Sequence, residues 1–492
     1  MRAATTLTTP ADAAYERAGD AAAAVPLVVD VDGTLVKTDL LLEAALQMAA
    51  RHPGELWRLP LWLAKGKAAL KTSLGDFGDP GVASIPLRSE VLQLIRSAQQ
   101  QGRAVYLASA SDRRYIEGLA ARIGGITGLF ATEGNVNLAG RAKAQRLVAE
   151  FGEKGFDYVA DAAVDFPVWR VARKVLGLTH GASFEARLLK AFPDAEIIAR
   201  TRPRSSDYVR ALRPHQWAKN VLIFLPLVAG HYFRLPDVVA ATTAFVCFCL
   251  AASSAYLIND LLDLASDRDH PRKSARPFAA GDIPLTHGVA GAFFLIVAAI
   301  GLASAVPSRF AAVLGVYWLG TLAYSFVLKR KMVVDVVMLG GLYTLRVLAG
   351  VAAIGTTSSP WLLMFCLFLF VSLAIVKRCS ELIARLSEGK PPPLGRGYRF
   401  EDLTPLLAFG AAAGYGAVFV VALYLSSPDV RALYDEPNRL WLICPVLLYW
   451  ITRVFMLANR GELHEDPLVF ALTDRTSWAA GAALVFVLAL AI

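Results

Sequence analysis

The second half of the chain consists largely of apolar stretches, each about as long as a helix needs to cross the hydrocarbon core of a bilayer. About nine follow one another, at residues 219–235, 238–258, 287–306, 309–328, 333–353, 361–379, 404–426, 438–457 and 476–492. In lipid, only helices and closed barrels satisfy every backbone hydrogen bond. The pattern therefore predicts an all-α polytopic membrane bundle of about nine helices and excludes a wholly soluble protein.

Charged residues divide the chain into two parts. Residues 1–200 carry 24 Lys+Arg and 22 Asp+Glu and none of these stretches, which predicts a soluble domain. Residues 1–24 are rich in Ala and Thr, do not resemble a signal peptide and predict a disordered tail. Further on, basic residues concentrate in alternate loops, around 268–276, 329–331 and 377–399. By the positive-inside rule, we expect these loops and the soluble domain to face the cytoplasm, at the inner membrane of a bacterial cell.

An acidic cluster stands at the end of the second apolar stretch and comprises Asn259, Asp260, Asp263 and Asp267. At roughly 100° per helical residue, these side chains fall on one face of a helix. Carboxylates on one face repel each other unless a cation lies among them, and Mg²⁺ prefers such oxygen ligands. The cluster predicts a magnesium-diphosphate site at a membrane surface, with Asp263 as its catalytic acid.

Basic residues follow this cluster directly, at Arg272, Lys273 and Arg276. Arginine can hold phosphate oxygens that a metal leaves free, and Arg276 is our preferred candidate. Positive-inside topology alone would also place cations in this loop. A further cation, Arg346, lies in the middle of stretch 333–353. An arginine within the membrane contacts either an anionic substrate or a structural partner, and both interpretations stay open here.

The N-D-x-x-D-x-x-x-D pattern of residues 259–267, followed by Arg276-Pro277 and Gly281, resembles the UbiA prenyltransferase superfamily over residues 205–492. Shorter motifs resemble its decaprenyl-phosphate phosphoribosyltransferase branch, at 212–220, 324–329, 335, 343–346, 377–382 and 466–475. That branch transfers 5-phosphoribose from phosphoribosyl diphosphate to a polyprenyl phosphate with Mg²⁺. The resemblance implies substrate-binding roles for Lys219, Arg272, Lys273, Arg276, Tyr324, Lys329, Asp335, Tyr343, Arg346, Lys377 and Arg378.

Two alternatives remain for the membrane half. Prenyltransferases that act on quinone precursors usually carry a second D-x-x-x-D motif, whereas the fourth position after Asp335 is Leu339. This departure favours a site in which Lys329 and Arg346 replace part of the second metal cluster. Transfer of an isoprenoid from its diphosphate to an aromatic or lipid acceptor is the second candidate. An anion or lipid transporter is a third, because Arg346 and the basic loops would also suit an anion path.

A different motif opens the soluble part. The apolar run Val25–Asp30 predicts a β-strand, and Asp30 and Asp32 stand two residues apart where it ends. One acid can attack phosphorus while the other handles the proton of the leaving group. A second predicted strand, 104–107, leads to Ser109, with Ser111 as an alternative, and Lys143 and the acids Asp161 and Asp165 follow in order.

This ordered set resembles the haloacid dehalogenase-like hydrolase family over about residues 25–185. The resemblance implies an α/β Rossmann-like domain, which we assign to residues 25–200, with a helical cap at roughly 39–75. It also implies Asp30 as nucleophile, Asp32 as acid–base, Ser109 and Lys143 around the phosphoryl group, and Asp30, Asp161 and Asp165 as Mg²⁺ ligands. Ala160 replaces the family's usual glycine, so a degenerate, purely structural domain is the alternative.

The reactions expected of the two halves are chemically compatible, because the product of the first can be the substrate of the second. The membrane half would make a polyprenyl-phosphoryl 5-phosphoribose, and the soluble half would remove its 5-phosphate. The partners we expect are a polyprenyl lipid, a diphosphate substrate and the membrane, with no nucleic acid. The sequence leaves open a homo-oligomer and the length of the isoprenoid.

Overall fold

The computed structural model describes residues 25–77, 81–132, 138–357, 359–392, 396–427, 430, 434–463 and 466–491, so the predicted tail lies outside the described residues. The chain divides into two compact units. The first comprises residues 1–212 with 257–290, and the second residues 213–256 with 291–492. The segment with the acidic cluster therefore packs with the soluble domain, which the sequence did not predict.

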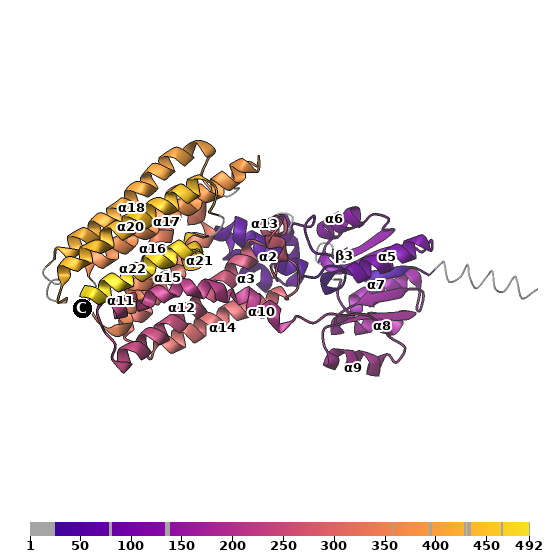
Figure 1. Ribbon diagram of the computed structural model, residues 1–492. Coiled ribbons are helices and arrows are strands. Elements are labelled where there is room, and N and C mark those ends of the chain that lie inside the picture. Colours follow the sequence, from indigo (N-terminus) through magenta and orange to yellow (C-terminus); the bar gives the residue numbers. More distant parts are fainter. Residues whose placement is uncertain are drawn as a thin grey trace, which may run out of the picture. The chain divides into compact units, whose positions relative to one another are not determined.

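The first unit contains a six-stranded parallel sheet, which appears with its helices in Figure 1. The strand order is β3-β2-β1-β4-β5-β6. The strands are β1 (Leu27–Asp30), β2 (Val105–Asp112), β3 (Gly128–Thr132), β4 (Asp157–Ala160), β5 (Lys174–Thr179) and β6 (Glu196–Arg200). Because all neighbours run parallel, the carboxyl ends of β2, β1 and β4 lie side by side at one edge of the sheet.

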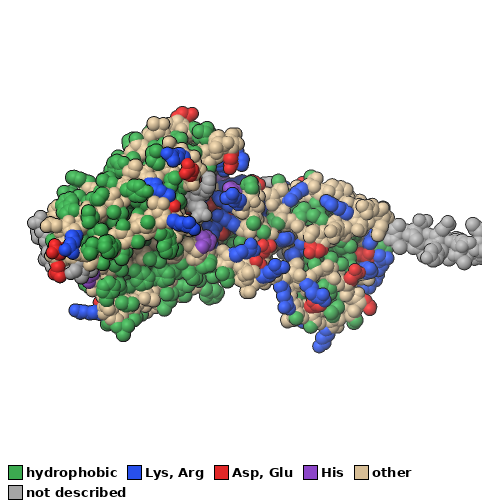
Figure 2. Space-filling view, in the orientation of Figure 1, with side chains coloured by type: hydrophobic (Ala, Val, Ile, Leu, Met, Phe, Trp, Pro, Cys, Tyr) green, Lys and Arg blue, Asp and Glu red, His purple; other side chains and the backbone are tan. Residues whose placement is uncertain are grey.

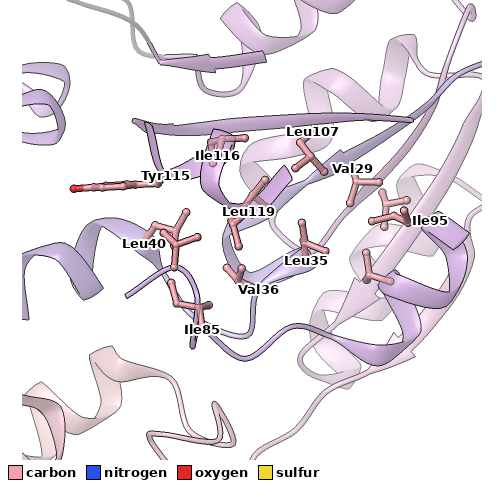
Figure 3. Close-up of a cluster of buried hydrophobic side chains, with 14 of the residues drawn as sticks. Val29, Leu35, Val36, Leu40, Ile85, Ile95, Leu107, Tyr115, Ile116 and Leu119 are labelled. Carbon is pink, nitrogen blue, oxygen red and sulfur yellow. The ribbon is translucent and has the colours of Figure 1, made fainter. Parts of the chain in front are cut away.

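Helices cover both faces of this sheet. Alternate residues of a strand point to opposite faces, so Val29 and Leu107 belong to one buried cluster and Val28 and Ala108 to another. The first cluster includes residues of α5 (Ser89–Gln100) and α6 (Arg113–Ile123), and Figure 3 shows Ile95, Ile116 and Leu119 among its members. The second includes residues of α7 (Arg141–Phe151), α8 (Phe166–Val171) and α9 (Ala182–Ala191). The predicted α/β layering is therefore present.

The predicted helical insertion forms α2 (Leu40–Arg51), α3 (Arg58–Ala64) and α4 (Lys67–Asp76). Pro60 lies in the first turn of α3, where a missing N–H is tolerated. Leu59 and Trp62 pack on the core beneath, whereas Trp57, Leu61 and Leu63 are 60%, 53% and 54% exposed.

The rest of the chain is helical, and several of its helices are apolar and long enough to cross a membrane. Among the described residues, six helices meet this criterion: Leu235–Leu262, Leu285–Ala303, Val334–Ile354, Pro360–Ser387, Phe400–Leu425 and Pro437–Asn459. They contain α12 (Leu235–Leu262), α14 (Leu285–Ala303), α16 (Val334–Ile354), α17 (Pro360–Ser387), α18 (Leu403–Leu425) and α20 (Ile443–Asn459). The remaining helices are α10 (Ser205–Leu212), α11 (Leu225–Ala229), α13 (Leu264–Arg268), α15 (Ser308–Phe326), α21 (Pro467–Thr473) and α22 (Arg475–Ala491).

The count of about nine helices stays a prediction, and its first stretch, 219–235, differs from expectation. There the chain forms a 3₁₀ segment, Pro214–Phe224, followed by the five residues of α11. Pro226 has no N–H to continue a helix, and His231 adopts a left-handed φ of 53° that ends it. An apolar sequence thus does not make one continuous span here.

Apolar side chains dominate the surface of this bundle, as the green regions of Figure 2 show. Phe293, Phe294, Phe409, Phe419 and Phe486 are all at least 61% exposed. Exposed aromatic and aliphatic residues over a continuous area are destabilising in water but favourable in lipid. The bundle therefore has the surface of an integral membrane domain.

Candidate functional site

The predicted residues of the soluble domain converge at the carboxyl edge of its sheet. Asp30 is the last residue of β1, Ser109 lies in β2, and Asp161 follows β4 directly. Asp32 stands in the turn after β1, and Lys143 and Asp165 come from α7 and from the 3₁₀ turn Ala163–Asp165. The structure thus brings all six together, although the segment from Asp30 to Asp165 is 136 residues long.

Lys143 is the cation at the centre of this cluster. Its Nζ donates to Asp30 Oδ1 at 2.6 Å and to Asp165 Oδ1 at 3.2 Å, and all three side chains are buried. Burial raises the pKa of Asp30, and Lys143 partly offsets that effect. Burial alone would lower the pKa of Lys143, but the two carboxylates hold it above the ordinary lysine value. The lysine therefore stays charged beside Asp30, where it can neutralise an incoming phosphate.

The Asp32 carboxylate accepts hydrogen bonds from two serine hydroxyls. Ser109 Oγ and Ser111 Oγ each lie 2.8 Å from Asp32 Oδ2, and the backbone N–H of Leu40 donates to Oδ1 at 2.9 Å. These bonds fix the carboxylate next to Asp30. Because both serines make the same contact, the structure leaves open which one would hold a phosphoryl group.

Asp161 lies close to the backbone of the loop after β1. A Cβ at Gly33 would lie 2.3 Å from Asp161 Oδ2, and Gly33 has a φ of +74°, so a side chain is excluded there on both grounds. Thr34 Oγ1 lies 3.1 Å from Asp30 Oδ2 and 3.0 Å from Asp161 Oδ1. Carboxylate oxygens gathered in this way are the ligands that Mg²⁺ prefers, so the residues fit that ion.

Contrary to our expectation, the acidic cluster does not lie on one continuous helix. Helix α12 ends at Leu262, Asp263 has non-helical dihedral angles, and α13 begins at Leu264. The break divides the four residues into two pairs. Asn259 Nδ2 donates to Asp263 Oδ2 at 3.0 Å, while Asp260 and Asp267 are both bound by Arg276.

Arg276 occupies the place of a cation between two carboxylates. Its Nη1 lies 3.2 Å from Asp260 Oδ1 and 2.5 Å from Asp267 Oδ2, and both acids are at most 2% exposed. Asp267 Oδ1 is buried and accepts no hydrogen bond from the described residues. Burial raises the pKa of Asp267, and Arg276 opposes this. Lys273 Nζ lies 4.0 Å from Asp267 Oδ1. A buried carboxylate oxygen without a hydrogen bond, beside a second acid bound to the same guanidinium, fits a Mg²⁺ site.

As placed, no three Asp, Glu, His or Cys side chains of the described ranges are arranged as metal ligands. In the acidic cluster, the reason is that Arg276 and the Asn259 amide satisfy the carboxylates instead. In the N-terminal domain, Lys143 forms ion pairs with Asp30 and Asp165. Both sites thus offer the right oxygen donors, held here by protein cations and amides.

The membrane bundle has its own polar cluster around Tyr343. Lys219 and Lys377 both donate to Asp466 Oδ2, at 3.0 and 2.6 Å. Burial would raise the pKa of Asp466, but the two lysines hold it well below its usual range. Lys219 Nζ and Arg346 Cζ lie 5.7 and 5.1 Å from the centre of the Tyr343 ring. Four predicted residues are thus assembled in one place.

Arg346 is buried in this cluster without a described carboxylate as partner. Its guanidinium donates to Asn220 Oδ1 at 2.8 Å, to Tyr317 OH at 3.0 Å and to Leu342 O at 2.7 Å. All three acceptors are neutral. A buried cation held by dipoles keeps its charge available for an anion, which favours the substrate interpretation over a structural ion pair.

A second polar cluster joins α16 and α17. Arg378 Nε donates to Asp335 Oδ2 at 2.6 Å, Nη1 to Glu381 Oε2 at 2.7 Å and Nη2 to Tyr324 OH at 3.0 Å. Tyr398 also donates to Asp335. Arg378 and Asp335 are at most 2% exposed. These contacts connect the predicted residues Tyr324, Asp335 and Arg378 to one another.

Replacement of Arg378 separates a structural role from substrate binding. We expect Arg378→Met to lower the unfolding temperature in detergent, because it leaves the buried Asp335 with only Tyr398 and the longer ion pair to Arg396 at 3.7 Å, a loss of up to about 3–5 kcal/mol. Fluorescence-detected size-exclusion after a heating series measures this. Arg385, which is only partly buried and lies on the same helix, provides the control as Arg385→Met. A stable Arg378→Met protein with a raised KM would instead establish the predicted contact with substrate.

Comparison with known proteins decides the family of the helical part. The sequence profile of the UbiA prenyltransferase family matches residues 221–470, about half of the chain. This chain belongs to the UbiA prenyltransferase family. The UbiA part includes the Tyr343 cluster and the acidic residues 259–267. Its membership agrees with the resemblance found in the sequence and makes an integral membrane transferase the framework for both clusters.

Curated relatives extend the comparison. The uncharacterized protein y4nM of Sinorhizobium fredii is 38% identical over 475 residues, which cover 95% of this chain and 91% of that protein. The decaprenyl-phosphate phosphoribosyltransferase of Mycolicibacterium smegmatis is 40% identical over 282 residues, which cover 55% of this chain and 87% of the enzyme. Among solved structures, a UbiA homolog from Archaeoglobus fulgidus bound to GPP and Mg²⁺ aligns with a TM-score of 0.44 at 19% identity, covering 57% of this chain and 99% of that one.

Several residues at these sites were not predicted. His180 Nε2 lies 2.6 Å from Asp161 Oδ2, and Arg88 donates to Gly33 O at 3.0 Å. Tyr317 and Glu381 enter the two UbiA clusters. His180, Arg88 and Tyr317 do not follow from local spacing, because each reaches its partner from a distant element, whereas Glu381 stands three residues after Arg378 on the same helix. Lys329 lies in the 3₁₀ turn Leu328–Arg330 and Arg272 in the loop after α13, and their substrate roles stay predictions.

Proposed function

We propose that the UbiA part transfers 5-phosphoribose from phosphoribosyl diphosphate to a polyprenyl phosphate, and that the N-terminal domain is a haloacid dehalogenase-type phosphatase that removes the 5-phosphate from the product. Both sites would face the cytoplasm, at the inner membrane of a bacterium. The relative from Mycolicibacterium smegmatis, a decaprenyl-phosphate phosphoribosyltransferase by name, supports the first reaction.

The observation that carries the transferase proposal is the excess of cations around Tyr343. Lys219 and Lys377 share one carboxylate, that of Asp466, and the partners of Arg346 among the described residues are all neutral. A reaction between a diphosphate donor and a phosphate acceptor brings two anions together and needs such an excess. An uncharged aromatic acceptor would not. The cluster therefore favours a phosphorylated acceptor.

At the acidic cluster, Asp260, Asp263 and Asp267 would hold Mg²⁺, with Asn259 beside them. When bound, the ion supplies charge neutralisation for the departing diphosphate. Arg276 would exchange its bonds to Asp260 and Asp267 for phosphate oxygens, because a guanidinium binds carboxylate and phosphate with the same geometry. The buried position of both acids would keep water away from the reacting carbon.

In the phosphatase site, Asp30 would attack the phosphorus of the 5-phosphate. The bond from phosphorus to the ribose C5 oxygen breaks, and a protonated Asp32 gives its proton to that oxygen. Asp32 then takes a proton from the water that hydrolyses the aspartyl phosphate, which restores Asp30. Lys143 neutralises the phosphoryl oxygens from its place between Asp30 and Asp165. This geometry supports an active domain over a degenerate one.

The reaction can be tested on the purified full-length protein in nanodiscs. Phosphoribosyl diphosphate labelled with ¹⁴C in the ribose is incubated with decaprenyl phosphate and Mg²⁺, and the lipid extract is analysed. We expect labelled decaprenyl-phosphoryl ribose without a 5-phosphate. Label that never enters the lipid fraction would contradict the transferase proposal, and a lipid product that keeps its 5-phosphate would contradict the phosphatase proposal.

The family name itself favours a second candidate, transfer of an isoprenoid from its diphosphate to an acceptor. Geranylgeranyl diphosphate replaces phosphoribosyl diphosphate in the same assay to compare the donors. Diphosphate release that requires the prenyl donor would establish this alternative. Release from either donor also separates a transferase from the anion or lipid transporter considered from the sequence.

Removal of divalent cations should stop both reactions. We expect EDTA to abolish label transfer and phosphate release, because the acids at each site would then repel the phosphate groups. Excess Mg²⁺ should restore both activities, whereas equimolar Ca-EDTA serves as the control for chelator effects on the membrane. Full activity after dialysis against EDTA would contradict the magnesium assignment at that site.

A further inference from the structure

A cavity of about 850 Å³ opens at the carboxyl edge of the sheet. The phosphatase residues Asp30, Asp32 and Lys143 line it. Part of its wall comes from the segment that follows the acidic cluster, at Gly281, Asp282, Pro284, Leu285 and Thr286. Leu285 is the first residue of α14, a helix apolar and long enough to cross a membrane. One wall of the phosphatase pocket is therefore the start of a membrane helix.

Specific contacts within the first unit hold this wall in place. Arg268 forms a two-pronged ion pair with Glu43 of α2, at 2.5 and 3.2 Å, and the two side chains are 4% and 0% exposed. Tyr208 OH lies 2.7 Å from His287 Nδ1, and Arg210 Nη2 3.5 Å from Asp282 Oδ2. A buried ion pair of this geometry breaks only at a large cost, so the wall is a fixed part of the pocket.

Gly281 lies directly against the catalytic loop. A Cβ on Gly281 would lie 2.6 Å from the Cβ of Lys37, and the residue has a φ of +71°. Lys37 follows the Asp30–Leu35 turn by two residues, so the wall and the catalytic loop meet at this point.

Three further cations, Lys37, Arg202 and Arg204, line the pocket. Among the described residues no close side-chain hydrogen bond or ion pair holds them, but each attracts an acid at longer range: Lys37 attracts Glu90, Arg202 attracts Glu185 and Arg204 attracts Asp207. Arg200, by contrast, is bound to Glu185, and Arg210 to Asp207. Acids also line the pocket away from the catalytic set, at Asp39, Glu90, Asp207 and Asp282. Because no close ion pair holds Lys37, Arg202 or Arg204, their side chains can turn toward a second phosphate, while Lys143 serves the phosphate at Asp30.

We propose that this pocket selects a membrane-anchored phosphate monoester that carries a second phosphate: the terminal phosphate reaches Asp30, the second phosphate binds Lys37, Arg202 and Arg204, and the lipid leaves along the start of α14. The proposal rests on the phosphatase function above and names its substrate class. A soluble sugar phosphate would lack both the second anion and the chain that the wall of α14 accommodates.

Three synthetic substrates separate these contributions, each tested with the full-length protein in nanodiscs. Ribose 5-phosphate has one phosphate, methyl-phosphoryl ribose 5-phosphate has two, and farnesyl-phosphoryl ribose 5-phosphate adds the lipid. We expect kcat/KM for phosphate release to rise in that order. In Lys37→Gln and in Arg202→Gln/Arg204→Gln, the loss should be about tenfold larger for the two-phosphate substrates than for ribose 5-phosphate.

The control is Arg96→Gln/Arg187→Gln, which removes two exposed cations of the same domain that do not line the pocket. We expect it to follow the wild type on all three substrates. Equal kcat/KM for the three substrates, or equal losses in the pocket and control variants, would overturn the inference while the phosphatase function stands. Absence of phosphate release from any substrate would overturn both.

Discussion

Replacement of Asp263 by Ala should abolish transfer to the lipid acceptor while the protein remains folded in the membrane. Asp263 stands at the break between α12 and α13, next to the two acids that Arg276 bridges. Its loss removes a charged ligand of the proposed Mg²⁺, so the diphosphate would leave without full neutralisation. Losses of a single electrostatic contact of this kind slow catalysis by about 10²–10³-fold. Incorporation of ¹⁴C-ribose into the lipid extract measures the effect.

Asp269 provides a matched control for this experiment. It is an exposed acid six residues further along, outside the two pairs of the acidic cluster, and Asp269→Ala should keep wild-type transfer. Phosphate release from ribose 5-phosphate should persist in both variants, which shows that the N-terminal domain is intact. Wild-type turnover by Asp263→Ala protein with Mg²⁺ would remove the acidic cluster from the mechanism.

Replacement of Asp30 by Asn should abolish phosphate release and leave ribose transfer intact, the reverse of the effect expected for Asp263→Ala. The amide keeps the size of the side chain and can still contact Lys143, but it cannot attack phosphorus. We expect phosphate release to fall by about four orders of magnitude or more, as for other lost nucleophiles. Ribose transfer should continue, so the lipid product should retain its 5-phosphate, which mass spectrometry of the lipid extract detects.

Asp194→Asn is the control for Asp30→Asn, because Asp194 is an exposed acid of the same domain and does not line the pocket. It should release phosphate at the wild-type rate. If Asp30→Asn protein still yields dephosphorylated lipid, another group is the nucleophile. If it loses ribose transfer as well, the two halves depend on each other more closely than separate active sites would require.

Order along the chain made the cluster around Asp30 at the sheet edge predictable. A parallel sheet brings the carboxyl ends of adjacent strands to one edge, so acids after β1 and β4 and a serine in β2 must meet there. The positions of Asp30, Asp161 and Ser109 agree with that expectation. His180 and Arg88 could not be foreseen, because their contacts depend on how the turns after β5 and before α5 fold back to the site.

The sequence by itself determined the apolar helical bundle, the N-terminal α/β domain and most residues that carry the polar clusters, because hydrophobic period and motif spacing are local properties. Only the tertiary structure decided that α12 stops before Asp263, that Arg276 bridges Asp260 and Asp267, and that Arg378 is bound by Asp335. It also decided that the segment after the acidic cluster packs with the soluble domain through Arg268 and Glu43. Pairing of buried charges depends on which helices meet in space, and no local pattern records it.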